Sequence, residues 1–183
     1  MISSVIITNL SEAKHMPYKK DLQQNAWITT TDPEDETSIK KLNQRFRAAG
    51  VKHFSQYFRD YSDEDTEAYV QSTLDTDGPQ ERHVNNIISF LEPLVASDAH
   101  YHLGVNCYAG ISRSTAIGII AWVMQGKSVE DALQSILEVR PIAWPNLRML
   151  RFASSRLGKN IMTYVSDWKV EEHKKGILAP YEL

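Results

Sequence analysis

One short segment of the sequence combines residue types that suit phosphate chemistry. It reads VNCYAGISRST over residues 105–115, and it joins a predicted strand to the start of an apolar helix. Successive backbone N–H groups of such a turn can point at one spot, and the helix dipole adds positive potential there. The segment therefore predicts a binding site for a tetrahedral oxyanion.

Cys107 is the only cysteine of the chain, and it lies at the lip of this predicted site. The donors that bind an oxyanion would also stabilise its thiolate, which is the nucleophilic form. Arg113, six residues later, can offer two parallel N–H bonds to phosphate oxygens. Gly110 gives the apex of the turn its backbone freedom, and Ser114 can hydrogen-bond the sulfur when it leaves. The alternative, a small buried structural cysteine, is disfavoured by this combination.

Strands and helices alternate in the first half of the chain, and helices dominate the second half. Strands are predicted at 3–8, 26–31, within 51–61 and at 101–106. Helices are predicted at 38–49, 81–97, 114–125, 128–140, 146–157 and around 163–174, and residues 9–25 form a loop or a short helix. The fold is predicted as α/β, with a single central mostly parallel sheet flanked by helices and the phosphate-binding loop between a strand and a buried helix. Residues 1–158 are expected to form the main domain, and 159–183 a C-terminal extension that packs on it or trails from it.

The pattern Cys107-x5-Arg113-Ser114 resembles the signature loop of the cysteine-dependent protein tyrosine phosphatases. The wording AGISRS over 109–114 is most similar to the dual-specificity branch and its small bacterial relatives. The resemblance implies that Cys107 attacks phosphorus, that Ser114 assists release of the thiolate, and that neither a metal nor a cofactor is needed. It further implies that the transition state is held by Arg113 and the backbone of Tyr108, Ala109, Gly110, Ile111 and Ser112.

Two asparagines are expected to support this loop. The family has a histidine immediately before the cysteine, where this chain has Asn106. Asparagine can still form hydrogen bonds, so a changed rate is expected rather than a dead enzyme. The departure keeps open a second hypothesis, a non-catalytic phosphate-binding pseudophosphatase. Asn146, after Pro145, resembles an asparagine that braces the loop in dual-specificity phosphatases, and it can also cap the helix that begins there.

The mechanism that the resemblance implies needs a general acid, because an alkoxide or phenoxide leaves poorly. Family members carry an aspartate on a loop after an upstream strand, and FRDY at 58–61 fits that position with Asp60. Residues 62–80 would then be an insertion, and Asp63 is the second candidate for the acid. Asp65, Asp75 and Asp77 belong to the same stretch, whose ordinary interpretation is a solvated acidic loop.

Composition excludes several classes of function. The 183 residues are 42% hydrophobic and 23% charged, with a net charge of −3, so no strong field favours nucleic acid or an anionic membrane. No apolar run approaches the roughly 18 residues that span a bilayer, and the N-terminus lacks the features of a secretory signal. A cytoplasmic monomer without nucleic-acid or membrane partners is expected.

Inositide-directed members of the family place lysines in the signature loop, whereas the residues around Gly110 are uncharged here. By resemblance, the expected substrate is a phosphorylated protein or peptide bound through phosphotyrosine, and both phosphotyrosine-only activity and additional activity on phosphoserine or phosphothreonine stay open. The alternative that stays open is a phosphatase of the same fold for a small phosphorylated metabolite, a nucleotide or an RNA end, because fold does not fix substrate.

Overall fold

The computed structural model describes residues 1–15, 25–65 and 76–177. Within these ranges one sheet contains the strands β1 (Ile2–Thr8), β2 (Asn25–Thr31), β3 (Lys52–Tyr57) and β4 (Tyr101–Asn106), in the order β1-β4-β2-β3. All three neighbouring pairs are parallel. β2 is buried at every position after Asn25, as is typical of a parallel strand that is covered on both faces.

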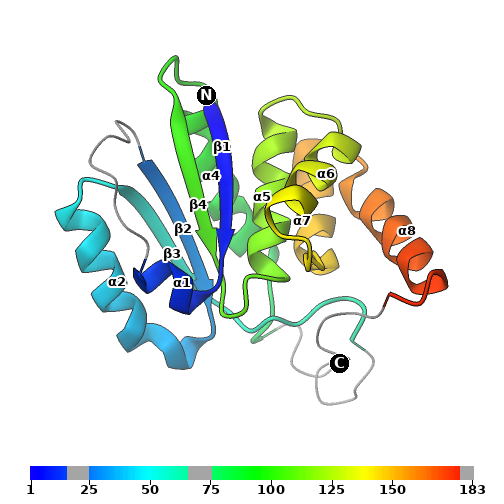
Figure 1. The fold of residues 1–183 in the computed structure, drawn as a ribbon, viewed down its shortest axis with the longest axis horizontal. Coiled ribbons are helices and arrows are strands. Elements are labelled where there is room, and N and C mark those ends of the chain that lie inside the picture. Colours follow the sequence, from blue (N-terminus) through cyan, green and yellow to red (C-terminus); the bar gives the residue numbers. More distant parts are fainter. Residues whose placement is uncertain (16–24, 66–75, 178–183) are drawn as a thin grey trace.

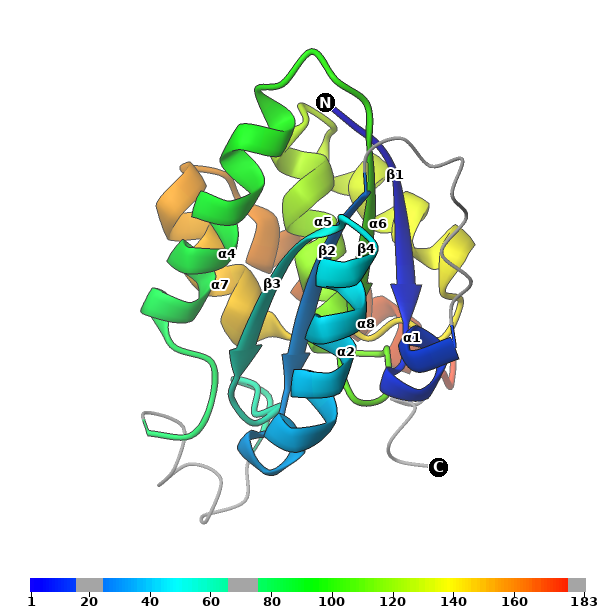
Figure 2. The same ribbon diagram turned by 90° about the vertical axis from the view of Figure 1, so that its left-hand side faces the viewer.

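Helices cover both faces of this sheet (Figures 1 and 2). On one face lie α1 (Leu10–His15) and α2 (Glu36–Ala48), which follows the short 3₁₀ turn η1 (Pro33–Asp35). On the other face lie α4 (Glu81–Val95) and α5 (Arg113–Met124), and beyond them are α6 (Val129–Val139), α7 (Leu147–Leu157) and α8 (Ile161–Lys174). The predicted α/β fold with a single parallel sheet is confirmed.

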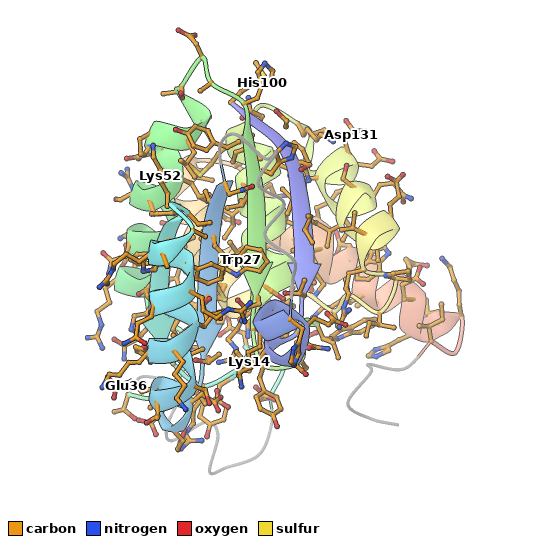
Figure 3. The ribbon with its side chains drawn as sticks, turned by 60° about the vertical axis from the view of Figure 1, so that its left-hand side comes forward. Lys14, Trp27, Glu36, Lys52, His100 and Asp131 are labelled. Carbon is orange, nitrogen blue, oxygen red and sulfur yellow. The ribbon has the colours of Figure 1, made fainter. Side chains whose placement is uncertain are left out.

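The two layers of helices enclose two apolar cores of unequal size. The larger core fills the space between the sheet and α4–α8, and it includes Ile161 and Val165 of α8. The smaller core lies beneath α1 and α2, where the Trp27 ring stacks on Phe46 with centroids 5.1 Å apart. Trp27 is labelled in Figure 3. A Cβ at Gly104 would lie 2.2 Å from the Trp27 ring, so this packing requires the glycine of β4.

The predicted elements differ from the structure mainly at their ends. The strand expected within 51–61 ends at Tyr57. The Phe58 N–H makes the last bond to β2, at the Thr31 carbonyl. The backbone then leaves β2, since the Arg59 N–H bonds to the carbonyl of Asp77. The segment 9–25 contains the short helix α1, and its residues 16–24 lie outside the described ranges, as do residues 66–75 of the predicted loop. None of the helices in the described ranges combines the length and apolar character needed to cross a bilayer.

Because the strands are parallel, their carboxyl ends meet at one edge of the sheet, where ligands bind in open α/β folds. In Figure 1 the arrowheads of the strands mark this edge, and α5 begins beside it. The residues that follow the four strands are Asn9, Asp32, Phe58 and Cys107. The topology therefore gathers the predicted nucleophile and the segment that contains Asp60 at one place.

Candidate active site

The segment between β4 and α5 curls around the sulfur of Cys107. The Gly110 N–H donates to Sγ over 3.2 Å, and the Ser114 Oγ lies 3.2 Å from the same sulfur. The Cys107 side chain is fully buried, and Ser114 belongs to the first turn of α5. The sulfur thus lies at the amino end of a helix, within hydrogen-bond distance of one backbone N–H and one hydroxyl.

The carbonyl groups of the loop are all bonded from outside it. The donors are Leu10 N to Tyr108 O at 3.1 Å, Arg140 Nη2 to Ala109 O at 3.0 Å, Arg140 Nε to Gly110 O at 3.1 Å, Trp144 N to Ile111 O at 2.9 Å and Asn146 N to Ser112 O at 3.3 Å. With its carbonyls turned outward, the loop can direct N–H groups inward, as Gly110 does toward the sulfur. Such a ring of donors matches the oxygens of a bound phosphate.

Two features of the structure require glycine at position 110. Its φ is 73°, in the left-handed region, and a Cβ would lie 2.8 Å from backbone atoms of Thr8 and Asn9. Because backbone cannot move aside as a flexible side chain can, the loop packs directly on the end of β1 only with glycine at this position.

Arg113 is the first residue of α5, and its side chain is 2% exposed. Its Nη1 donates to Asp32 Oδ1 over 2.8 Å and to the carbonyl of Phe58, and its Nε lies 3.4 Å from Asp60 Oδ2. Burial opposes the charge on the guanidinium, but Asp60, Cys107 and Asp32 outweigh it and raise the pKa of Arg113. The arginine is a fixed cation beside the cysteine.

Asp60 lies directly against the signature loop. Its Oδ1 accepts hydrogen bonds from Ser112 Oγ at 2.7 Å and from Asn146 Nδ2 at 3.0 Å. An open pocket between the two loops is lined by Asp60, Ser62, Asp65, Ala109, Ile111 and Ser112. This position suits a group that delivers a proton to an oxygen leaving from a phosphate in the loop.

The other acidic candidates have different partners. Asp63 binds two arginines of α7, with Oδ1 3.3 Å from Arg148 Nη1 and Oδ2 2.7 Å from Arg151 Nε. Asp65 accepts a hydrogen bond from the Ser62 N–H, Asp77 lies 3.9 Å from Arg59, and Asp75 is outside the described residues. The geometry favours Asp60 over Asp63 as the acid.

Asn146 caps α7 as expected, but its side chain contacts the segment that contains Asp60 and not the signature loop. Its Oδ1 caps α7 by accepting from the Met149 N–H at 3.0 Å. Its Nδ2 donates to Asp60 and to the carbonyl of Tyr61 at 2.9 Å, while only its backbone N–H contacts the signature loop. The side chain therefore anchors the segment that contains the candidate acid.

Asn106 is fully buried and faces β2. Its Oδ1 accepts from Trp27 Nε1 at 2.7 Å and from Thr29 Oγ1 at 2.8 Å, while its Nδ2 has no hydrogen-bond partner among the described residues. These contacts fix the end of β4 one residue before Cys107. Asn106 thus supports the loop through the strand beneath it.

Two residues of the site are not among the sequence candidates. Asp32, which pairs with Arg113, follows β2 directly, and that position at the carboxyl edge is a signal that could have identified it. Arg140 donates to two carbonyls of the signature loop and pairs with Glu12 of α1 at 3.3 Å. Nothing local in the sequence distinguishes Arg140 from a solvated arginine at the end of a helix.

Comparison with known proteins finds sequence relatives over part of the chain and solved structures with the same fold over most of it. No protein-family model matches the chain. The chain is 37% identical over 83 residues to the protein phosphatase Slingshot homolog 3 of Homo sapiens. The aligned residues make up 44% of this chain and 12% of that protein. The corresponding protein of Mus musculus is 38% identical over 80 residues and is likewise covered to 12% of its length. The chain therefore spans a small part of these relatives.

Solved structures share the fold over most of the chain. Tk-PTP in its active form has a TM-score of 0.52 and 15% identity, covering 84% of this chain and 90% of that one. Human DUSP28 has a TM-score of 0.50 and 16% identity, covering 82% and 89%. PTPMT1 in complex with PI(5)P has a TM-score of 0.50 and 14% identity, covering 91% and 94%. The chain thus shares the fold of these solved structures, and 83 of its residues are similar in sequence to a Slingshot phosphatase.

Proposed function

We propose that the chain is a protein phosphatase that hydrolyses phosphotyrosine, and also phosphoserine or phosphothreonine, through a phosphocysteine intermediate. The observation that carries the proposal is the buried Cys107 sulfur, which has the Gly110 N–H and the Ser114 hydroxyl each at 3.2 Å. A cysteine with only a packing function needs neither contact. Arg113 and Asp60 complete the set of groups that phosphoryl transfer requires.

In the first step the Cys107 thiolate attacks phosphorus, so an S–P bond forms as the P–O bond to the leaving group breaks. Asp60 transfers its proton to the leaving oxygen, and the loop N–H groups and Arg113 hold the three remaining phosphate oxygens. In the second step Asp60 accepts a proton from water, which attacks phosphorus and breaks the S–P bond. The Ser114 hydroxyl donates to the departing thiolate, and inorganic phosphate is released.

Side chains around the loop support a peptide substrate. Tyr108 is 61% exposed at the rim, and Ala109, Ile111 and Ser112 carry no charge that would select a polyanionic headgroup. The Slingshot relatives are named as protein phosphatases, although the chain covers 12% of their length. Both observations favour phosphorylated side chains over inositides or nucleotides.

A panel of phosphotyrosine, phosphoserine and phosphothreonine peptides, phosphoinositides and nucleotides tests this substrate class. We expect the highest kcat/KM on a phosphotyrosine peptide, by about tenfold or more over any phosphoinositide or nucleotide, because Tyr108, Ala109, Ile111 and Ser112 of the loop offer an anionic headgroup no positive charge. A preference for phosphoinositides or nucleotides would contradict the proposed substrate while leaving the chemistry intact.

Asp60→Asn is expected to lower turnover of phenyl phosphate by about 10²-fold or more, because this poor leaving group needs a proton. The same change should lower kcat/KM for a dinitrophenyl phosphate only slightly, since that leaving group departs as a stable anion and kcat/KM does not include the second step, in which Asp60 acts as the base. Asp63→Asn is the matched control, because Asp63 is bound to Arg148 and Arg151 and faces α7. A larger and leaving-group-dependent loss in Asp63→Asn would assign the acid to Asp63 instead.

A further inference from the structure

Lys169 of α8 is a buried cation beside the candidate active site. Its side chain is 3% exposed, and its Nζ donates to both carboxylate oxygens of Glu64, at 2.9 and 2.6 Å. Burial lowers the pKa of Lys169, and the Glu64 carboxylate opposes this shift. Lysine is rarely buried unless it is paired, so this ion pair is a specific feature of the fold.

Glu64 lies four residues after Asp60, at the far end of the segment 60–65, which contains no helix or strand. The near end of this segment is held by Asn146 through Asp60 and the Tyr61 carbonyl. The middle is held by α7, where the Leu147 N–H donates to Ser62 Oγ at 3.2 Å. The far end is held by Lys169. The position of Asp60 therefore depends partly on a contact with α8.

Lys169 also contacts a residue that supports the signature loop. Its Nζ lies 5.0 Å from the centroid of the Trp144 ring, which also packs against Trp168 of α8 with centroids 5.6 Å apart. The Trp144 backbone N–H donates to the carbonyl of Ile111 at 2.9 Å. One ammonium group thus touches the segment of the acid and the residue behind the loop of the nucleophile.

We propose that Lys169 is a positioning residue that holds the Asp60 segment at its distance from the signature loop through Glu64 and Trp144. This inference rests on the proposed function, because it concerns delivery of the proton by Asp60. It makes α8, which lies in the predicted C-terminal extension 159–183, part of the catalytic unit.

The test compares Lys169→Met with Lys174→Met. Methionine keeps most of the apolar stem of lysine and removes the charge. Lys174 pairs with Glu171 on the exposed side of the same helix. For Lys169→Met we expect kcat/KM for phenyl phosphate to fall about tenfold and kcat/KM for a dinitrophenyl phosphate to change less than about twofold, because formation of the phosphocysteine needs the acid only with the first. Glu64→Gln should give the same split, and Lys174→Met should change neither rate.

A second comparison uses the Asp60→Asn background. There, Lys169→Met should cause no further loss on phenyl phosphate, since the proton donor is already absent. Equal losses on both phosphates in a variant that thermal unfolding shows to be folded, an unchanged phenyl phosphate rate, or a full additional loss in Asp60→Asn would each overturn the proposal. Thermal unfolding of each variant identifies a general loss of folded protein, which lowers both rates equally.

Backbone amide exchange gives a readout that does not depend on turnover. Lys169→Met should increase exchange at residues 61–65 relative to Lys174→Met, and unchanged exchange there would contradict the positioning contact. Wild-type turnover of either phosphate tests the proposed function itself. A failure of the proposed phosphatase activity is therefore distinguishable from a failure of the positioning role of Lys169.

Discussion

Cys107→Ser is expected to abolish hydrolysis of phosphotyrosine peptides and aryl phosphates, with a loss on the order of 10⁴-fold or more. The proposed mechanism needs an anionic nucleophile, and a serine hydroxyl is not ionised at neutral pH. The variant should keep the fold, because the hydroxyl can replace the thiol beside Gly110 and Ser114. Steady-state rates, together with binding of tungstate by calorimetry, check both expectations.

Retained turnover in Cys107→Ser would remove the cysteine from the mechanism. A folded wild type that binds tungstate but hydrolyses none of the phosphates would instead support the pseudophosphatase hypothesis raised by Asn106. In that case Asn106→His tests whether the missing histidine is the cause. Because Asn106 bonds to Trp27 and Thr29, this variant must also be checked for stability.

Arg113→Lys is expected to lower kcat/KM by about 10³-fold or more and to weaken tungstate binding. Lysine keeps the charge but loses the planar pair of N–H groups that matches two phosphate oxygens. It also cannot reach Asp32, the Phe58 carbonyl and Asp60 from one head group, as the guanidinium does. The variant therefore loses the paired contact with phosphate and also the contacts with Asp32, Phe58 and Asp60 that orient the side chain.

The matched control for this change is Arg156→Lys. Arg156 lies on α7, where its side chain is 51% exposed and 3.6 Å from Glu92. We expect no change in kcat/KM for the control, since exposed ion pairs contribute little. A kcat/KM for Arg113→Lys within about tenfold of the wild type would show that a single positive charge suffices at this position.

The geometry of the loop around Cys107 could be predicted from sequence because it is local. Cys107, Gly110, Arg113 and Ser114 lie within eight positions, and the turn between a strand and a buried helix brings them together without help from distant residues. The sheet could be predicted for a related reason, because short β-branched runs alternate with helical spacing in the first half of the chain. Only the ends of elements, such as that of β3 at Tyr57, depended on contacts with other segments.

The supports of the site are long-range, and no local pattern reveals them. Asp32 is 81 positions from Arg113, Arg140 is 30 positions from Gly110, and Lys169 is 105 positions from Glu64. Charged residues of these types are usually exposed to solvent. Arg140 and Lys169 contact the site only because α6, α7 and α8 pack where they do. The same applies to Asn106, whose partners lie on β2.

The most direct test of the central claim is to quench the wild type with acid during hydrolysis of an aryl phosphate and to locate phosphate on the chain by mass spectrometry. EDTA is present throughout, and vanadate serves as the inhibitor in a parallel sample. The account predicts turnover that vanadate inhibits, with phosphate covalently attached to Cys107 and lost when vanadate is added. Turnover under the same conditions with no phosphate on Cys107, or with phosphate on another residue, would contradict it.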